Sequence, residues 1–386
     1  MSAPFTAIEL FCGAGGLSIG LERAGFNVAI ANEVEPDFVK TFQINHPNTR
    51  VLNCDIHLVN FENEAVKLGL STVTLLSGGP PCQGFSTVGS KNQHDPRNSL
   101  FFEFIRAIRE LRPSYVLFEN VSGFKKLFNG MAFNALSSEL ENLGYEIKAA
   151  VLDTSDFGLP QERQRTIVVG WEKGLTPVLL PAPTHFGQES LFECQRKLTL
   201  MDAISDLPSL EAAEEKTDYK CEPMNDYQKK MRGDETKLTE HNSSNYGEKM
   251  KEILRSVPYG GSVNDLPAKL RPKSYFKNTY SRLLPDRPSP TITRNFGTPS
   301  SSRCIHPFQN RALSTREGAR LQGFHDSYKF YGSKISKNLQ IGNAVPPIFG
   351  EIIAKEIIKS ISANAENIKV FSSPKYAVGD FETFVQ

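Results

Sequence analysis

Short apolar runs alternate with amphipathic segments over the first 170 residues of the chain. In a segment such as 100–111, apolar residues recur every three or four positions, which predicts a helix with one buried face. Alternating buried strands and helices are typical of a parallel sheet that is covered on both faces. A glycine-rich first turn favours a doubly wound α/β sheet over a closed barrel. The runs expected to form strands are residues 7–12, 28–31, 72–76, 115–118 and 166–169.

The pattern changes after Trp171. Three prolines within residues 177–183 mark a linker, and the next hundred residues show no strong periodicity. A helical pattern returns near residues 347–361. We therefore expect a first domain over residues 1–172 and a smaller, loop-rich second domain over 173–315. The segment 316–386 is expected to return to the first domain.

The composition excludes several classes of protein. With 39% hydrophobic and 23% charged residues, the chain is neither disordered nor collagen-like nor a coiled coil. It contains no run of eighteen apolar residues, and its N-terminus does not resemble a secretory signal, so we expect a soluble protein of the cytoplasm. The six cysteines form no CxxC pair, which predicts reduced thiols and no metal site.

The formal charge of +1 hides an uneven distribution of charged residues. Residues 249–303 contain eleven basic residues against three acidic ones, whereas residues 202–226 contain eight acidic against two basic. A basic stretch can follow a phosphate backbone, although it can equally be a solvated face.

The first turn has the features of a cofactor site. The run IELFCGAGG at residues 8–16 is an apolar strand followed by glycines, and a helix is expected to begin near Leu17. Its glycine spacing does not match the dinucleotide pattern GxGxxG. Glu33 follows the second run and is placed to accept hydrogen bonds from ribose hydroxyls, and Asp55 is placed to meet an adenine amine. These residues indicate a nucleoside cofactor, and the alternative is a tight turn with surface acids.

Cys82 differs from the other cysteines because of its neighbours. It lies in SGGPPCQGFS, residues 77–86, directly after the third predicted strand. Ligand sites of open α/β sheets form beyond the carboxyl ends of the strands, and two prolines fix the direction of the thiol. This position favours a thiolate nucleophile over an inert packing cysteine.

A carboxyl and two guanidiniums follow the next strands. Glu119 ends the run FENV, on a strand expected to neighbour that of Cys82. Arg163 and Arg165, in QERQR, alternate on one face of a strand start, where guanidiniums suit carbonyl or phosphate oxygens. On their own, these two residues would more often be surface charges.

The set resembles a known family. LFCGAGG, ANEVEP, GGPPCQGFS, FENVSGF, QERQR, RPSPTIT and GNAVPP occur in the order seen in the C5-cytosine DNA methyltransferases, most nearly the bacterial restriction–modification type. The match covers about residues 7–170 and 287–350, and the stretch between them corresponds to the variable target-recognition region. The resemblance implies a doubly wound, Rossmann-like methyltransferase domain that depends on S-adenosylmethionine, together with a smaller, loop-rich target-recognition domain.

The resemblance also implies roles for individual residues. Cys82 adds to C6 of cytosine, Glu119 hydrogen-bonds N3 and the exocyclic amine, and Arg165 contacts O2 with Arg163 in support. The implied cofactor contacts are Phe11, Gly13, Gly15, Gly16, Glu33, Asp55, Ile56, Pro81 and Asn343.

The implied substrate is double-stranded DNA from which the target cytosine is flipped out. Residues 83–97 are expected to close over this DNA, with Ser86 among the contacts. The resemblance further implies a monomer in the bacterial cytoplasm, with a cognate restriction endonuclease as a functional rather than a physical partner. No membrane and no metal are expected to take part.

Three alternatives stay open at this point. A tRNA cytosine-5 methyltransferase shares the chemistry, although this chain lacks the Cys-Phe-Thr tripeptide of those relatives. An oxidoreductase with a nucleotide cofactor would leave Cys82 and Glu119 unexplained. A silent DNA-binding relative would usually have lost one of these two residues.

Overall fold

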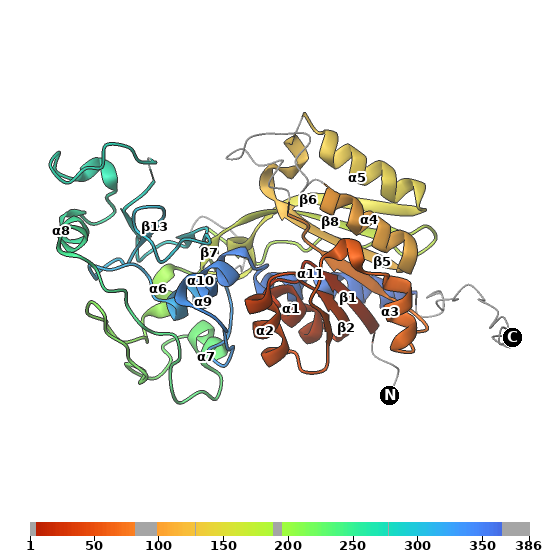
Figure 1. Cartoon of the computed structure of the whole chain (residues 1–386), viewed down its shortest axis with the longest axis horizontal. Helices are drawn as coiled ribbons and strands as arrows, with labels where there is room; N and C mark the ends of the chain where they lie inside the picture. The colour runs from red at the N-terminus through yellow and green to blue at the C-terminus, as the bar shows by residue number, and fades with distance from the viewer. Residues whose placement is uncertain (1–4, 82–98, 128, 188–194, 277, 365–386) are drawn as a thin grey trace, which may run out of the picture.

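The computed structural model describes residues 5–81, 99–127, 129–187, 195–276 and 278–364, arranged in two lobes (Figure 1). The larger lobe holds a seven-stranded sheet in the order β3-β2-β1-β4-β5-β8-β6. Cys82 and residues 83–97, including Ser86, lie outside the described residues. The strands of the sheet are β1 (Phe5–Leu10), β2 (Phe26–Asn32), β3 (Arg50–Leu52), β4 (Leu75–Gly78), β5 (Tyr115–Val121), β6 (Tyr145–Asp153) and β8 (Gln164–Glu172).

One strand departs from the expected parallel sheet. Strand β8 pairs antiparallel with both β5 and β6, whereas β1 to β5 pair parallel. Only residues 154–163, with η5 (Thr154–Phe157) and β7 (Gln161–Glu162), connect β6 to its neighbour β8. A parallel connection needs a crossover of about a dozen residues or more, so this short connection enforces the antiparallel pairing.

Helices cover both faces of the sheet, as the sequence predicts. Alternate strand residues point to opposite faces, so Leu75 and Leu117 belong to one buried cluster and Leu76 and Val116 to the other. Helices α1 (Gly16–Ala24) and α11 (Pro347–Ala363) pack on the first face. The other face carries α3 (Phe61–Lys67), α4 (Ser99–Leu111) and α5 (Met131–Asn142), and α2 (Pro36–Asn45) lies near the end of β2.

Helix α11 lies against α1 in the sheet lobe, although the two are far apart in the sequence. A Cβ atom on Gly20 would lie 2.4 Å from the backbone nitrogen of Glu351, so only glycine permits this approach. The chain therefore returns to the sheet lobe through α11. The domain boundaries at residues 172 and 315 stay a prediction.

The smaller lobe is rich in loops, and buried ion pairs supplement its apolar core. Arg320 hydrogen-bonds Asp206 and Asp326 at distances of 2.5 to 3.0 Å, and all three side chains are fully buried. Removing one partner would leave a buried charge unpaired, so the network holds these three side chains in one arrangement. The lobe's helices are α6 (Leu200–Ile204), α7 (Asp226–Arg232), α8 (Glu248–Ser256), η6 (Val263–Asp265), α9 (Thr315–Leu321) and α10 (Lys334–Asn343). Its short strands are β9 (His185–Phe186), β10 (Gln195–Arg196), β11 (Ser281–Arg282), β12 (Ser289–Pro290) and β13 (Arg303–Ile305).

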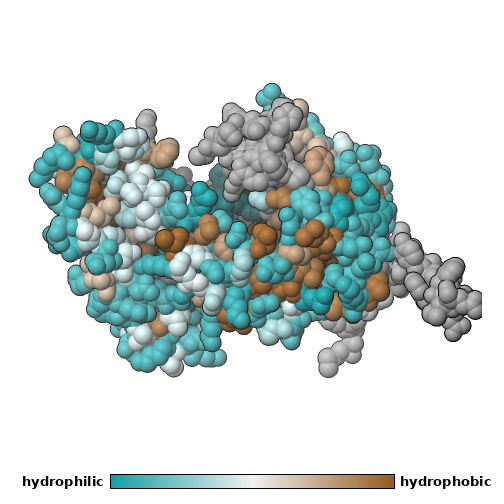
Figure 2. All heavy atoms as spheres, viewed as in Figure 1, coloured by the Kyte–Doolittle hydropathy of each residue, from teal (hydrophilic) through white to brown (hydrophobic). Residues whose placement is uncertain are grey.

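The surface is hollowed between the lobe that carries α8 and the lobe that carries the sheet (Figure 2). Strand β12 of the smaller lobe pairs parallel with β7, so a two-stranded sheet connects the two lobes.

Candidate active site

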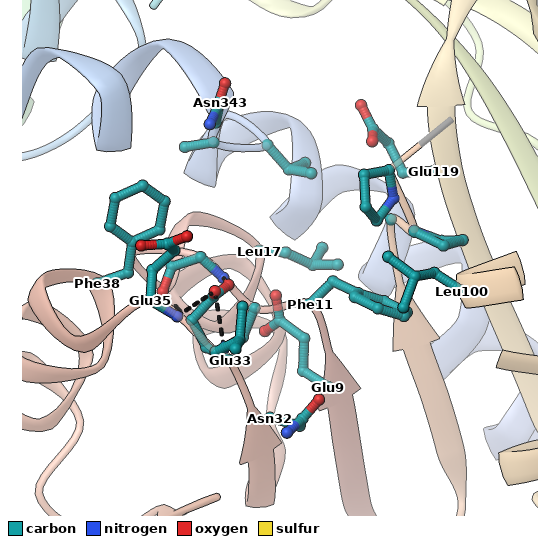
Figure 3. Close-up of a pocket in the computed structure, with 18 of the residues that line it drawn as sticks. Glu9, Phe11, Leu17, Asn32, Glu33, Glu35, Phe38, Leu100, Glu119 and Asn343 are labelled. Carbon is teal, nitrogen blue, oxygen red and sulfur yellow. Dashed lines mark hydrogen bonds between the residues drawn. The ribbon is translucent and has the colours of Figure 1, made fainter. Parts of the chain in front are cut away.

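A cavity of about 540 Å³ lies at the carboxyl ends of β1, β2, β4 and β5 (Figure 3). This is the edge at which open α/β sheets bind their ligands, and the volume suits a cofactor. Most of the residues singled out from the sequence line this one cavity, namely Phe11, Gly13, Glu33, Asp55, Ile56, Pro81, Glu119, Arg163, Arg165 and Asn343.

The first turn fixes Glu33 on the cavity wall. The backbone N–H of Gly13 donates to Glu33 Oε2 at 2.9 Å, and the N–H groups of Val34 and Glu35 donate to Oε1 at 2.9 and 3.0 Å. Burial nevertheless raises the pKa of Glu33, and the three backbone donors counter this effect. Phe11 lies nearby with a positive φ of 56°. A left-handed backbone is strained in a bulky residue, and such strain concentrates at functional sites.

Two predicted cofactor residues do not line the cavity. A Cβ atom on Gly15 would lie 2.6 Å from His46 Nε2, and one on Gly16 would lie 2.3 Å from the carbonyl oxygen of Val345. Both glycines therefore let the turn pack closely against α2 and the segment before α11. Their contact with a cofactor stays a prediction.

Asp55 and Ile56 form the next part of the wall. Asp55 accepts hydrogen bonds from the backbone N–H of His57 at 3.0 Å and pairs with His57 Nδ1 at 2.6 Å. The backbone hydrogen bond lowers the pKa of Asp55. Ile56 is buried beside it, in η1 (Ile56–Leu58). The pair offers one acceptor and one apolar surface to a ligand.

Glu119 stands on the opposite side of the cavity, at the end of β5 (Figure 3). Its Oε1 lies 2.9 Å from Arg165 Nε, and both side chains are largely buried. Strands β4 and β5 pair parallel, so Glu119 neighbours the turn that leads to Cys82, as predicted. A Cβ atom on Gly79 would lie 3.1 Å from Glu119 Oε2, so glycine gives the carboxyl room.

Asn120 holds the turn before Cys82. Its Nδ2 donates to the carbonyl oxygen of Pro80 at 3.0 Å, which joins the end of β5 to the end of β4. Pro81, the last described residue before Cys82, lines the cavity. Pro81, which directly precedes the predicted nucleophile Cys82, therefore lines the same cavity as Glu119.

Arg163 and Arg165 both line the cavity but have different partners. Arg163 donates to the carbonyl oxygens of Ile292, Gly342 and Ala344 at 3.0 to 3.2 Å. Burial lowers the pKa of both arginines, and the Glu119 carboxylate beside Arg165 counters this effect. In the structure, Arg163 binds two distant segments, at Ile292 and at Gly342 to Ala344, and Arg165 lies against Glu119.

The sequence model of the C-5 cytosine-specific DNA methylases matches residues 5–359. The chain belongs to this family. Its fold, its family and its activity as a DNA (cytosine-5) methyltransferase are therefore as the sequence predicts. The comparisons favour neither the RNA methyltransferase nor the oxidoreductase alternative.

Relatives of this methyltransferase span nearly the whole chain. Type II methyltransferase M1.HphI of Haemophilus parahaemolyticus is 34% identical over 92% of this chain and 87% of its own length. Type II methyltransferase M.DdeI of Desulfomicrobium norvegicum is 33% identical over 96% and 92%. A solved Escherichia coli structure, described as a prophage-encoded DNA modification methyltransferase, is 27% identical with a TM-score of 0.75 over 93% of this chain and 99% of its own.

Sequence reasoning missed several residues that line the methyltransferase's cavity. Glu9 had a visible signal, because a charged residue interrupts an otherwise apolar run. Asn32 donates from Nδ2 to the carbonyl oxygens of Leu52 and Cys54 at 3.0 Å and so joins β2 to the chain after β3. Ala344 and Val345 lie in the motif GNAVPP, from which only Asn343 was singled out. Leu17, Phe38 and Leu100 reach the cavity through the tertiary fold and carry no local signal.

Among the residues that the structure describes, no group of three or more His, Cys, Asp or Glu side chains could hold a metal ion. In the same part of the chain, no helix has the length and apolar character needed to cross a bilayer.

Proposed function

We propose that this methyltransferase transfers a methyl group from S-adenosylmethionine to C5 of a flipped-out cytosine in a short, specific sequence of double-stranded DNA. The observation that carries the proposal is the buried Glu119–Arg165 pair, which faces the cofactor-sized cavity beside the turn leading to Cys82. The modification protects DNA from a cognate restriction endonuclease.

The residues around the cavity fit S-adenosylmethionine. Glu33 is held by backbone donors and has acceptor capacity for ribose hydroxyls, and Asp55 offers an acceptor for the adenine amine. The Phe11 ring and Ile56 supply apolar surface, and Asn343 closes the cavity from α10. When bound, this cofactor supplies an electrophilic methyl carbon on a sulfonium.

The chain's own residues prepare the cytosine for this transfer. The Cys82 thiolate attacks C6, and the new S–C6 bond pushes electrons toward N3 and C5. Protonated Glu119 donates to N3 and its other oxygen accepts from the exocyclic amine, so that the ring accepts these electrons, and Arg165 contacts O2. After C5 has taken the methyl group, loss of its proton and breakage of the S–C6 bond release Cys82.

Duplex DNA occupies the hollow between the lobes. Attack at C6 comes from above the ring plane, which stacking blocks, so the base must leave the helix at a cost of a few kcal/mol. The basic stretch of residues 249–303 contacts phosphates, while polar side chains of the smaller lobe read base edges. The enzyme works as a monomer in the bacterial cytoplasm, and the endonuclease is a functional partner only.

Bisulfite sequencing tests the function directly. Plasmid DNA from a methylation-deficient host that expresses the chain is expected to keep unconverted cytosines in one short motif. The same host expressing Cys82→Ser provides the control and is expected to show complete conversion. Complete conversion with the unmodified chain, present as folded protein, would contradict the proposal.

Phe11 allows a separate test of the cofactor site. Phe11→Ala and Phe11→Gly both remove the ring and are expected to weaken S-adenosylmethionine binding about tenfold or more. Only glycine relieves the left-handed backbone, so Phe11→Gly should exceed Phe11→Ala in stability by about 1 kcal/mol. Calorimetric titration and denaturant unfolding measure the two effects. Equal stability of the two variants, or unchanged affinity, contradicts this assignment.

A further inference from the structure

Glu9 is a buried carboxyl on the cavity wall that the proposed chemistry does not use. It lies in β1, its side chain is 3% exposed, and it lines the cavity beside Phe11 (Figure 3). The Ser18 hydroxyl donates to its Oε2 from the first turn of α1. A carboxyl near the end of a central strand is costly to bury, which points to a use at the cavity.

Among the residues that the structure describes, the ionisable groups that act on Glu9 include no cation. Glu22 on α1 and Glu33 after β2 are the charged groups that raise its pKa further, beyond the larger effect of burial. Cys12 at the end of β1 and Tyr328 also lie near it, and burial raises the pKa of both. Its neighbour on β4, Ser77, is uncharged. The pKa of Glu9 is raised to about 8, chiefly by burial, so the protonated form of the Glu9 carboxyl is favoured at neutral pH.

A cationic ligand would therefore supply a positive charge that the described groups acting on Glu9 do not provide. S-Adenosylmethionine carries a sulfonium, and its demethylated product, S-adenosylhomocysteine, carries a neutral thioether in its place. A cation in the cavity stabilises an ionised carboxyl nearby, and a neutral thioether does not. The two ligands are otherwise alike, so a carboxyl that changes its ionisation can tell them apart.

We propose that Glu9 discriminates the cationic cofactor from the neutral product by releasing its proton when S-adenosylmethionine binds and keeping it when S-adenosylhomocysteine binds. The Glu9 O–H bond breaks, the proton goes to solvent, and the carboxylate that remains would offset the positive charge of the bound cofactor. The inference rests on the cofactor named in the proposed function. The enzyme then holds S-adenosylhomocysteine less tightly than S-adenosylmethionine, because product binding leaves Glu9 neutral.

Calorimetric titration counts the released protons. Binding heats are measured near neutral pH in two buffers of different ionisation enthalpy, for the unmodified enzyme and for Glu9→Gln. We expect close to one more proton released per S-adenosylmethionine bound by the unmodified enzyme than by the variant, and no such difference with S-adenosylhomocysteine. Comparison with the variant removes the contribution of the ligand's own amino group. Glu35→Gln is the matched control, because it removes an exposed carboxyl from the same cavity and should leave the proton count unchanged.

A second measurement uses the unmodified enzyme alone. Between about pH 5.5 and pH 7, the α-amino groups of both ligands stay protonated, whereas Glu9 must lose its proton to hold the sulfonium. The ratio of affinities for cofactor and product should therefore rise about tenfold per pH unit in this window. A flat ratio, or equal proton counts with and without Glu9, overturns the inference. Failure to bind S-adenosylmethionine at all would instead overturn the cofactor assignment.

Discussion

Cys82→Ser is expected to lower methyl transfer at least about 10⁴-fold, because a serine hydroxyl is far less ionised than a thiol and cannot replace the nucleophile. The described residues around Cys82 do not depend on its sulfur. Pro81 already lines the cavity, and Asn120 holds the turn through the carbonyl oxygen of Pro80. The variant should therefore fold, bind S-adenosylmethionine and bind duplex DNA as the unmodified enzyme does.

The measurement is single-turnover methyl transfer to DNA, with cofactor affinity determined in parallel. Cys221→Ser is the matched control, because Cys221 is a partly exposed thiol of the smaller lobe and does not line the cavity. It should retain full activity. Substantial activity of Cys82→Ser, beside an equally active Cys221→Ser, would remove the thiolate from the mechanism.

The parts of the fold that follow from local pattern were predictable. Apolar runs mark five strands of the sheet, and the rule that ligands bind beyond the carboxyl ends of parallel strands places Glu33, Asp55 and Glu119 on one cavity. Strands β3 and β6, at the two edges of the sheet, escaped prediction. Strand β3 has only three residues, and the buried and exposed residues of β6 do not alternate cleanly. The direction of β8 depends on the length of a connection, which an apolar run does not reveal.

The distinct roles of similar residues were not predictable from the sequence. Arg163 and Arg165 are two residues apart in QERQR, yet Arg163 binds three carbonyl oxygens from two distant segments and Arg165 faces a carboxylate. Gly15 and Gly16 look like a ligand cradle but pack against His46 and Val345. In each case the partner lies far away in the sequence, so spacing alone cannot identify it.

Glu119 and Arg165 are expected to act as a unit, with Glu119→Gln lowering methyl transfer about 10²- to 10³-fold. The amide keeps part of the hydrogen bonding to the cytosine but loses the charge that faces Arg165 Nε at 2.9 Å. Arg165→Ala should cost about as much, because it removes the O2 contact and leaves the buried carboxylate without its partner. Arg165→Lys keeps a charge without the planar fork and should recover only part of the rate.

The double variant Glu119→Gln/Arg165→Ala separates a unit from two independent residues. If Arg165 acts largely by orienting Glu119, the double variant should be hardly slower than the slower single variant. Multiplied losses would show that the two residues contribute independently. Arg109→Ala provides the control, because Arg109 on α4 forms an exposed ion pair with Glu139 on α5 at 3.4 Å. Exposed pairs contribute about 1 kcal/mol or less, so this variant should keep its methylation rate, and only the buried pair at the cavity should affect chemistry.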